Sequence, residues 1–134
     1  IGEAGQGWTI ALVTLGQERL TLGSQAVAIF ERHEQLVEAA RARHLLDPAL
    51  SRSLTKLWAR IWLLRFTWQR AFEGADLASP EFSVLKLMTT ETDRDLSDLA
   101  TDVLGTDACA DPADEELVQY MLVGRAQTIL GGTS

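Results

Sequence analysis

Glu18 is the carboxylate whose position most strongly suggests chemistry. It falls between Leu15 and Leu22 on an apolar stripe with helical spacing, and Arg19 follows it directly. A carboxylate at such a position either borders a cavity or is paired, and burial of a carboxylate raises its pKa and makes it a better base near neutral pH. The alternative is a glutamate at the edge of the stripe with its carboxylate in water. The spacing alone leaves both interpretations open.

Two histidines and three tryptophans are weaker candidates. His33 lies on the same stripe and His44 near its end, but neither has a second His, Cys or carboxylate at ligand spacing. We therefore expect core or end-cap histidines and no metal site. Trp58, Trp62 and Trp68 share a segment with several arginines, as aromatic and basic side chains do on nucleic-acid-binding faces. The formal net charge of −7 argues against phosphate binding, so we expect packed tryptophans flanked by exposed arginines.

The last residues form a third candidate, Gly131-Gly132-Thr133-Ser134. Two glycines followed by hydroxyl side chains resemble a loop and a helix cap, which is by itself a weak anion-binding signal. The helix that this cap should start is absent, and the chain begins with a loop-like Ile-Gly-Glu-Ala-Gly stretch and no initiator Met. We therefore expect the sequence to be a piece of a longer protein.

Helices must position these residues. Asp47-Pro48, Ser79-Pro80 and Asp111-Pro112 each place a capping side chain before a proline, which suits the first turn of a helix. They predict helices from Pro48, from Pro80 and from Pro112 to about Thr128, after a first helix of about 34 residues. The stretch 102–111 reads as a polar connection, with Gly105 ending a helix. The apolar positions expected to be buried are Trp8, Leu12, Leu15, Leu22, Ala26, Ile29, Leu36 and Ala40, then Leu50, Leu54, Leu57, Ile61, Leu64, Trp68 and Phe72, then Phe82, Leu85, Leu96, Leu99 and Val103.

The composition supports the same architecture. With 134 residues, 46% of them hydrophobic, the chain suits one domain with a real core. Nothing alternates with period two, so we predict an all-α fold, an antiparallel up-down four-helix bundle. The single cysteine, Cys109, excludes an internal disulfide and is typical of a reducing compartment such as the cytoplasm. The uncharged runs are too short for a membrane span.

Two segments at opposite ends of the chain resemble parts of the same protein family. Gly5-Gln6-Gly7-Trp8-Thr9-Ile10-Ala11, running on to Gly16-Gln17-Glu18-Arg19, resembles the opening of the C-terminal helical domain of acyl-CoA dehydrogenases. Thr128-Ile129-Leu130-Gly131-Gly132-Thr133-Ser134 is similar to the signature that precedes the last helix of that family. The resemblance spans nearly the whole chain. It implies that residues 1–134 are the C-terminal bundle, with the N-terminal helical and middle β-domains of the family lying outside this sequence.

The resemblance implies a reaction and its residues. In this family a glutamate removes the α-proton of an acyl-CoA thioester while the β-hydrogen leaves as hydride to FAD, giving a trans-2-enoyl-CoA. The electrons then pass to an electron-transfer flavoprotein. Most members carry the base where this chain has Gly131, but a minority carry it in a Glu-Arg pair on the first bundle helix, as in Glu18-Arg19. The residues assigned in this way are Glu18 as catalytic base, Gly16, Gln17, Arg19 and Gly132 beside the acyl-CoA substrate, and Gly105, Thr133 and Ser134 beside FAD.

Two departures bear on the cofactor and the partners. The Arg-x-x-Phe-Gly element of the family would fall at 43–48, where this chain lacks Phe-Gly, and its Gln-x-x-Gly-Gly element would fall at 102–106, where only one glycine remains. Both weaken a flavin site on this subunit. The Asp-Pro segments resemble those of actinobacterial members, some of which pair two different subunits for steroid side-chain β-oxidation. We therefore expect a homo- or hetero-oligomer formed through the bundle. A non-catalytic assembly subunit and an unrelated acidic helical binding module are the alternatives.

Overall fold

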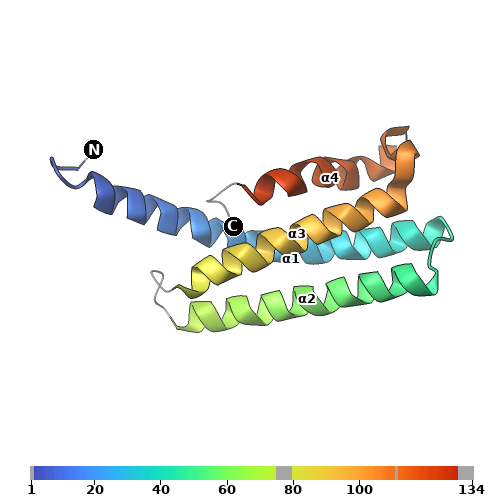
Figure 1. Ribbon diagram of the computed structural model, residues 1–134, viewed down its shortest axis with the longest axis horizontal. Coiled ribbons are helices and arrows are strands. Elements are labelled where there is room, and N and C mark those ends of the chain that lie inside the picture. Colours follow the sequence, from blue (N-terminus) through green and yellow to red (C-terminus); the bar gives the residue numbers. More distant parts are fainter. Residues whose placement is uncertain (1, 75–79, 111, 130–134) are drawn as a thin grey trace.

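Four helices make up the structure, which is a computed structural model (Figure 1). It describes residues 2–74, 80–110 and 112–129, with only the backbone at 12, 15–24, 107, 109, 110, 113, 125 and 127. The helices are α1 (Gly7–Ala42), α2 (Pro48–Glu73), α3 (Glu81–Leu104) and α4 (Glu115–Gln127), with 3-10 turns at Gly105–Ala110 and Pro112–Asp114. No strand occurs in these ranges. The predicted all-α bundle is confirmed, and α1 has 36 residues.

Local capping chemistry explains where α2 begins. The Asp47 carboxylate accepts hydrogen bonds from the backbone N–H groups of Ala49 (2.8 Å) and Leu50 (2.7 Å), and Pro48 occupies the first turn. These bonds satisfy donors that a helix start leaves free, so the start predicted at Pro48 is confirmed. The start predicted at Pro80 is confirmed within one residue, since α3 begins at Glu81; Ser79 and Asp111 lie outside the described residues.

The start predicted for the last helix is wrong by three residues. Pro112–Asp114 forms a 3-10 turn, and the α-helix begins only at Glu115. The Asp114 side chain is buried in an ion pair with Arg43 from the end of α1, so it is not available to cap its own helix. A tertiary contact therefore decides this helix start.

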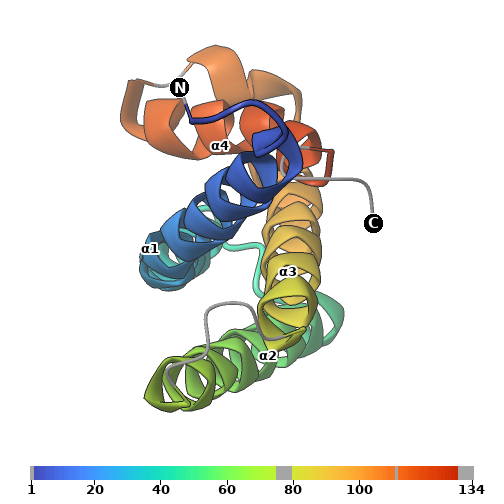
Figure 2. The same cartoon turned by 90° about the vertical axis from the view of Figure 1, so that its left-hand side faces the viewer.

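The core lies around α3, which packs against each of the other helices (Figure 2). Most of the predicted apolar positions are buried, namely Ile29, Leu36, Ala40, Leu54, Leu57, Ile61, Leu64, Trp68, Phe82, Leu85, Leu96 and Val103. Ala26, Leu50 and Leu99 are partly buried against them, and the side chains of Leu12, Leu15 and Leu22 lie outside the described residues. The prediction is wrong for Trp8, which is 76% exposed, and for Phe72, which is 47% exposed, because the stripe continues past the ends of the helices that cover it.

Threonines replace apolar side chains along one part of α3. Thr89, Thr90 and Thr92 are fully buried, and each donates its hydroxyl to a carbonyl one turn earlier. The distances from Thr89 to the Leu85 carbonyl and from Thr92 to the Met88 carbonyl are 2.7 and 2.6 Å. Such bonds satisfy the hydroxyls within their own helix. Thr89 also accepts a hydrogen bond from the Trp68 indole N–H at 3.4 Å, so the core accommodates these polar residues.

The connection after α3 is more ordered than the sequence indicates. Gly105 ends α3 as predicted, with a φ of 63° that favours glycine. However, Asp102 still belongs to α3, and residues 105–110 form a 3-10 turn. Ala108 in that turn is buried against the bundle. The expectation of a purely polar connection is wrong, because this turn contributes an apolar side chain to the core.

Gly124 lets α4 approach α3 closely, which yields a prediction. A Cβ at this position would lie 2.0 Å from Oγ and 3.1 Å from Cβ of Ser97. Ser97 Oγ donates to the Asp93 carbonyl at 2.9 Å, so moving it breaks a buried hydrogen bond. We expect Gly124→Ala to destabilise the docking of α4 by about 1–3 kcal/mol, measured as faster amide hydrogen exchange in α4.

A matched glycine provides the control. Gly7 lies in the first turn of α1, and a Cβ there would meet nothing within 4 Å. We expect Gly7→Ala to leave the exchange of α4 unchanged. Equal exchange in α4 for wild type and Gly124→Ala would contradict the close approach.

Candidate functional site

The predicted base Glu18 and three of the predicted substrate-binding residues lie on the first half of α1. This half projects beyond the ends of α2 and α3 in Figure 1. Gly16, Gln17, Glu18 and Arg19 all belong to the helix, but their side chains lie outside the described part of the structure. Glu18 lies within a helix, as predicted. Whether its carboxylate borders a cavity stays a prediction.

The direction of α4 bears on how the two ends of the chain meet. Successive residues toward the C-terminus of α4 contact residues progressively closer to the N-terminus of α1. Asp114 pairs with Arg43, and Glu116 accepts a hydrogen bond from Gln35 (3.3 Å). The Tyr120 ring lies against Arg32. Hence α4 runs antiparallel to α1, and its last turn at Gln127 points toward the half of α1 that contains Glu18. The predicted site residues Gly132, Thr133 and Ser134 lie outside the described residues.

Gly105 ends α3 at the end of the bundle where α1 also ends, whereas Glu18 belongs to the first half of α1, which projects from the other end (Figure 1). Arg43, which follows the end of α1, is 25 residues from Glu18, or roughly 38 Å at the rise of a helix. One bound molecule at Glu18 and Gly105 of the same chain would have to span that length. The structure therefore does not bring these two predicted site residues together.

The surroundings of Gly105 can be tested against the pyrophosphate of a flavin dinucleotide. A Cβ there would meet nothing within 4 Å, so the backbone is open to a ligand. The charges at the end of the bundle where α1 and α3 both end do not suit one: Arg43 is paired with Asp114, Arg41 is paired with Glu38, and the exposed Asp102 adds a carboxylate. Because a pyrophosphate needs cations or free N–H donors, the described residues at this end do not form such a site by themselves.

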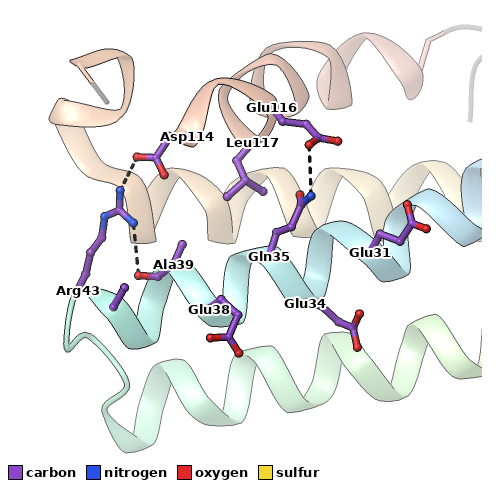
Figure 3. Close-up of a pocket in the computed structure, with 10 residues that line it drawn as sticks. Glu31, Glu34, Gln35, Glu38, Ala39, Arg43, Asp114, Glu116 and Leu117 are labelled. Atoms are coloured by element: carbon purple, nitrogen blue, oxygen red, sulfur yellow. Dashed lines mark hydrogen bonds and ion pairs between the residues drawn. The ribbon is translucent and has the colours of Figure 1, made fainter. Parts of the chain in front are cut away.

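A groove of about 770 Å³ lies between α1 and the start of α4. Figure 3 shows Arg43 reaching Asp114 and Gln35 reaching Glu116 across it. The remaining charged residues that line it are carboxylates, namely Glu31, Glu34 and Glu38. A surface with this charge repels a polyanion such as coenzyme A. The groove is therefore not a candidate for the acyl-CoA site.

A buried polar cluster joins α1, α3 and α4, and the sequence reasoning missed it. Arg32 donates to the Asp93 carboxylate at 3.2 Å, and its guanidinium lies over the Tyr120 ring. Burial lowers the pKa of Arg32 to about 10 against the opposing attraction of Asp93, and burial likewise raises the pKa of Asp93 against the attraction of Arg32. Desolvation is the largest cause of both pKa shifts. Removing the two charged groups from water therefore costs free energy, which their mutual attraction offsets only in part. The contacts of this pair connect α1, α3 and α4.

The histidines have structural surroundings. His33 is buried, and its Nε2 lies 2.9 Å from the Leu54 carbonyl, which confirms the predicted core histidine and ties α1 to α2. His44 is exposed after the end of α1 with a φ of 57°. Among the described residues, no group of three or more His, Cys, Asp or Glu could hold a metal ion. Across the same residues, no helix is both long and apolar enough to span a membrane.

Comparison with known proteins decides the family. The profile of the family described as "Acyl-CoA dehydrogenase, C-terminal domain" matches residues 5–134. The chain belongs to the acyl-CoA dehydrogenase family. The acyl-CoA dehydrogenase IpdE1 of Mycobacterium tuberculosis is 33% identical over the whole chain, and that of Mycolicibacterium smegmatis is 31% identical. The chain spans only 36% and 35% of these two relatives.

A solved structure shares the fold of this acyl-CoA dehydrogenase domain. It is described as a variant of the Tcur3481–Tcur3483 steroid ACAD and superposes with a TM-score of 0.81 at 25% identity. The match covers 98% of this chain and 37% of the other. The bundle is thus similar, over nearly its full length, to about a third of a larger dehydrogenase chain.

Proposed function

We propose that this chain is the C-terminal helical domain of an FAD-dependent acyl-CoA dehydrogenase that converts an acyl-CoA thioester to a trans-2-enoyl-CoA. The observation that carries the proposal is the family match over residues 5–134 together with the Glu18-Arg19 pair on α1. N-terminal helical and middle β-domains would precede it in the full-length enzyme. The isolated bundle would be inactive, because it lacks most of the enclosure of the substrate.

Glu18 is the proposed base. Its carboxylate takes the α-proton of the thioester, the α C–H electron pair becomes the new α,β double bond, and the β-hydrogen leaves as hydride. FAD, when bound, supplies the hydride acceptor, and an electron-transfer flavoprotein would reoxidise it. Gly16, Gln17, Arg19 and Gly132 are proposed to lie along the acyl-CoA, and Gly105, Thr133 and Ser134 along FAD. Thr133 and Ser134 would act in the same subunit as Glu18, whereas Gly105, at the other end of the bundle, would contact a flavin bound elsewhere.

The substrate class follows from the relatives. One of them is described as a steroid ACAD, so a steroid-derived acyl-CoA is the first substrate to test beside a straight-chain fatty acyl-CoA of β-oxidation. The experiment is to purify the full-length protein, record its visible flavin absorbance, and follow enoyl-CoA formation with an artificial electron acceptor. Flavin-loaded protein that oxidises neither class would contradict the proposal.

A second candidate is a non-catalytic assembly subunit in a heteromeric dehydrogenase. The ion pairs of Arg41 and Arg43 favour it, since these cations of the bundle end where α1 finishes are already paired with carboxylates. So does the two-part name of the similar solved structure. The flavin content separates the candidates: one FAD per chain, in protein purified without a second subunit, would exclude the assembly role.

A further inference from the structure

A hollow of about 410 Å³ between α1 and α2 has mainly apolar walls. The Phe30 ring from α1 meets the Trp62 ring edge-on, with centroids 5.9 Å apart, and the Trp68 and Phe72 rings stack at 5.2 Å. The other apolar residues that line the hollow are Ala26, Val27 and Ile61. Walls whose rings pack against one another are formed before a ligand arrives, as in most small-molecule sites.

Two polar side chains complete the lining, Arg65 and Gln69, which are one helical turn apart on α2. Neither forms a hydrogen bond or an ion pair with another described residue. The Arg65 guanidinium carbon lies over the Trp62 ring, 5.1 Å from its centroid. The Trp62 indole N–H is itself shielded from solvent without an acceptor among the described residues, although shielded donors normally have one. An unpaired cation and an unsatisfied donor are therefore neighbours on the wall of the hollow.

The charges around this hollow differ from those of the other hollows in the bundle. None of the described residues that line it is acidic. In the groove between α1 and α4 the lining arginine, Arg43, is already paired with Asp114. In a further hollow between α2 and α3 the lining arginine, Arg60, is paired with Asp95 at 2.6 Å. The hollow between α1 and α2 therefore offers its cation to an anion from outside the chain.

The lining restricts the kind of anion that fits. A phosphate chain or a nucleotide needs several cations or free backbone N–H groups, and the described lining provides one arginine. Aromatic and aliphatic walls instead favour an apolar body, with a few polar groups that fix its orientation. The matching ligand carries one negative charge at one end of an apolar body. None of the residues assigned to the acyl-CoA or to FAD lines this hollow.

We propose that the hollow between α1 and α2 binds an apolar monocarboxylate. The carboxylate accepts from the Arg65 guanidinium and the Trp62 indole N–H, and the apolar body lies among the rings of Phe30, Trp68 and Phe72. The body is an aliphatic chain or an alicyclic ring system, since the walls are apolar on both helices. This inference goes beyond the proposed reaction, because the binding requires neither FAD nor turnover.

The test is isothermal titration calorimetry of the full-length protein with probes that share one tail and differ in the head group. The probes are octanoate, 1-octanol and octyltrimethylammonium, and 1-adamantanecarboxylate represents the alicyclic ring. At least one carboxylate is expected to bind with a dissociation constant below about 1 mM. Octanoate should bind about fivefold or more tightly than 1-octanol, because only octanoate pairs with the arginine.

Two substitutions on the wall test the recognition of the charge. Arg65→Met keeps a long apolar side chain and is expected to weaken octanoate binding about fivefold to tenfold, while 1-octanol stays within about twofold. Gln69→Glu keeps the size of the side chain and places a carboxylate one turn from Arg65, where it pairs with the guanidinium. This variant is expected to weaken octanoate binding about fivefold and to strengthen octyltrimethylammonium binding about threefold.

Arg52→Met is the matched control for Arg65→Met. Arg52 is an exposed arginine of the same helix, also without an ion pair among the described residues, and it does not line the hollow. Its substitution should leave octanoate binding within about twofold. Arg65 and Gln69 are both exposed, so all three variants should keep the thermal unfolding midpoint of wild type within a few degrees.

The head-group series distinguishes this site from other ways of filling the hollow. A neighbouring protein segment seated in it would leave both carboxylates unbound, which would overturn the inference. So would equal affinities for octanoate and 1-octanol in wild type, or octanoate binding that neither Arg65→Met nor Gln69→Glu changes, as expected for a carboxylate bound elsewhere. Because titration is read without turnover, protein without flavin or activity that binds octanoate as expected would contradict the proposed reaction alone.

Discussion

Replacing Glu18 with glutamine in the full-length enzyme is expected to lower the rate of acyl-CoA dehydrogenation by about 10²- to 10⁴-fold. The amide is nearly isosteric with the carboxylate but cannot accept the α-proton. Because the change removes a step of the reaction and little of the binding, the loss should fall on kcat more than on KM. The visible flavin absorbance should be unchanged, since Glu18 is not assigned to the cofactor.

The same helix provides a matched control for Glu18. Glu34 is an exposed carboxylate of α1 that lines the acidic groove, 16 residues from Glu18. Glu34→Gln makes an identical chemical change and is expected to leave the rate within about twofold, as for a surface substitution. Glu18→Asp keeps a carboxylate on a shorter side chain and should retain more activity than Glu18→Gln. Equal rates for wild type and Glu18→Gln would remove Glu18 from the mechanism.

The elements whose ends depend on local chemistry could be predicted from the sequence. The Asp47 carboxylate accepts hydrogen bonds from the backbone N–H groups two and three residues later in the chain. Its capping role could therefore be predicted from the local sequence alone. Gly105 ends α3 for an equally local reason, its positive φ. The start of α4 could not be predicted in this way. It depends on an ion pair between Asp114 and Arg43, which are 71 residues apart.

The aromatic residues show a second limit of sequence patterns. Helical spacing identified Trp68 as a core residue, and the structure confirms it. The same reasoning predicted packing for Trp58, which is 47% exposed. The identity of a residue does not show which side of its helix the rest of the chain covers. The catalytic assignment likewise came from resemblance, since spacing alone left Glu18 open between a buried base and a solvated edge residue.

Replacing Asp93 with asparagine is expected to destabilise the packing of α1, α3 and α4 by about 3 kcal/mol. The variant leaves the Arg32 guanidinium buried without a compensating charge, and the Tyr120 ring offsets only part of that cost. In a multidomain enzyme the local measure is amide hydrogen exchange, which should become about a hundredfold faster in these helices.

Two further variants test whether the loss of stability comes from leaving the Arg32 charge buried and unpaired, and not from the loss of a carboxylate as such. Glu91 also lies on α3 and pairs with an arginine, Arg60, but its side chain is 38% exposed. Glu91→Gln is therefore expected to cost less than about 1 kcal/mol, because water stabilises the charge that remains. The double variant Arg32→Met/Asp93→Leu removes both buried charges and is expected to recover most of the lost protection. Recovery without activity would mean that the pair fixes the helix register on which the site at Glu18 depends, whereas a double variant as unstable as Asp93→Asn would contradict the desolvation argument.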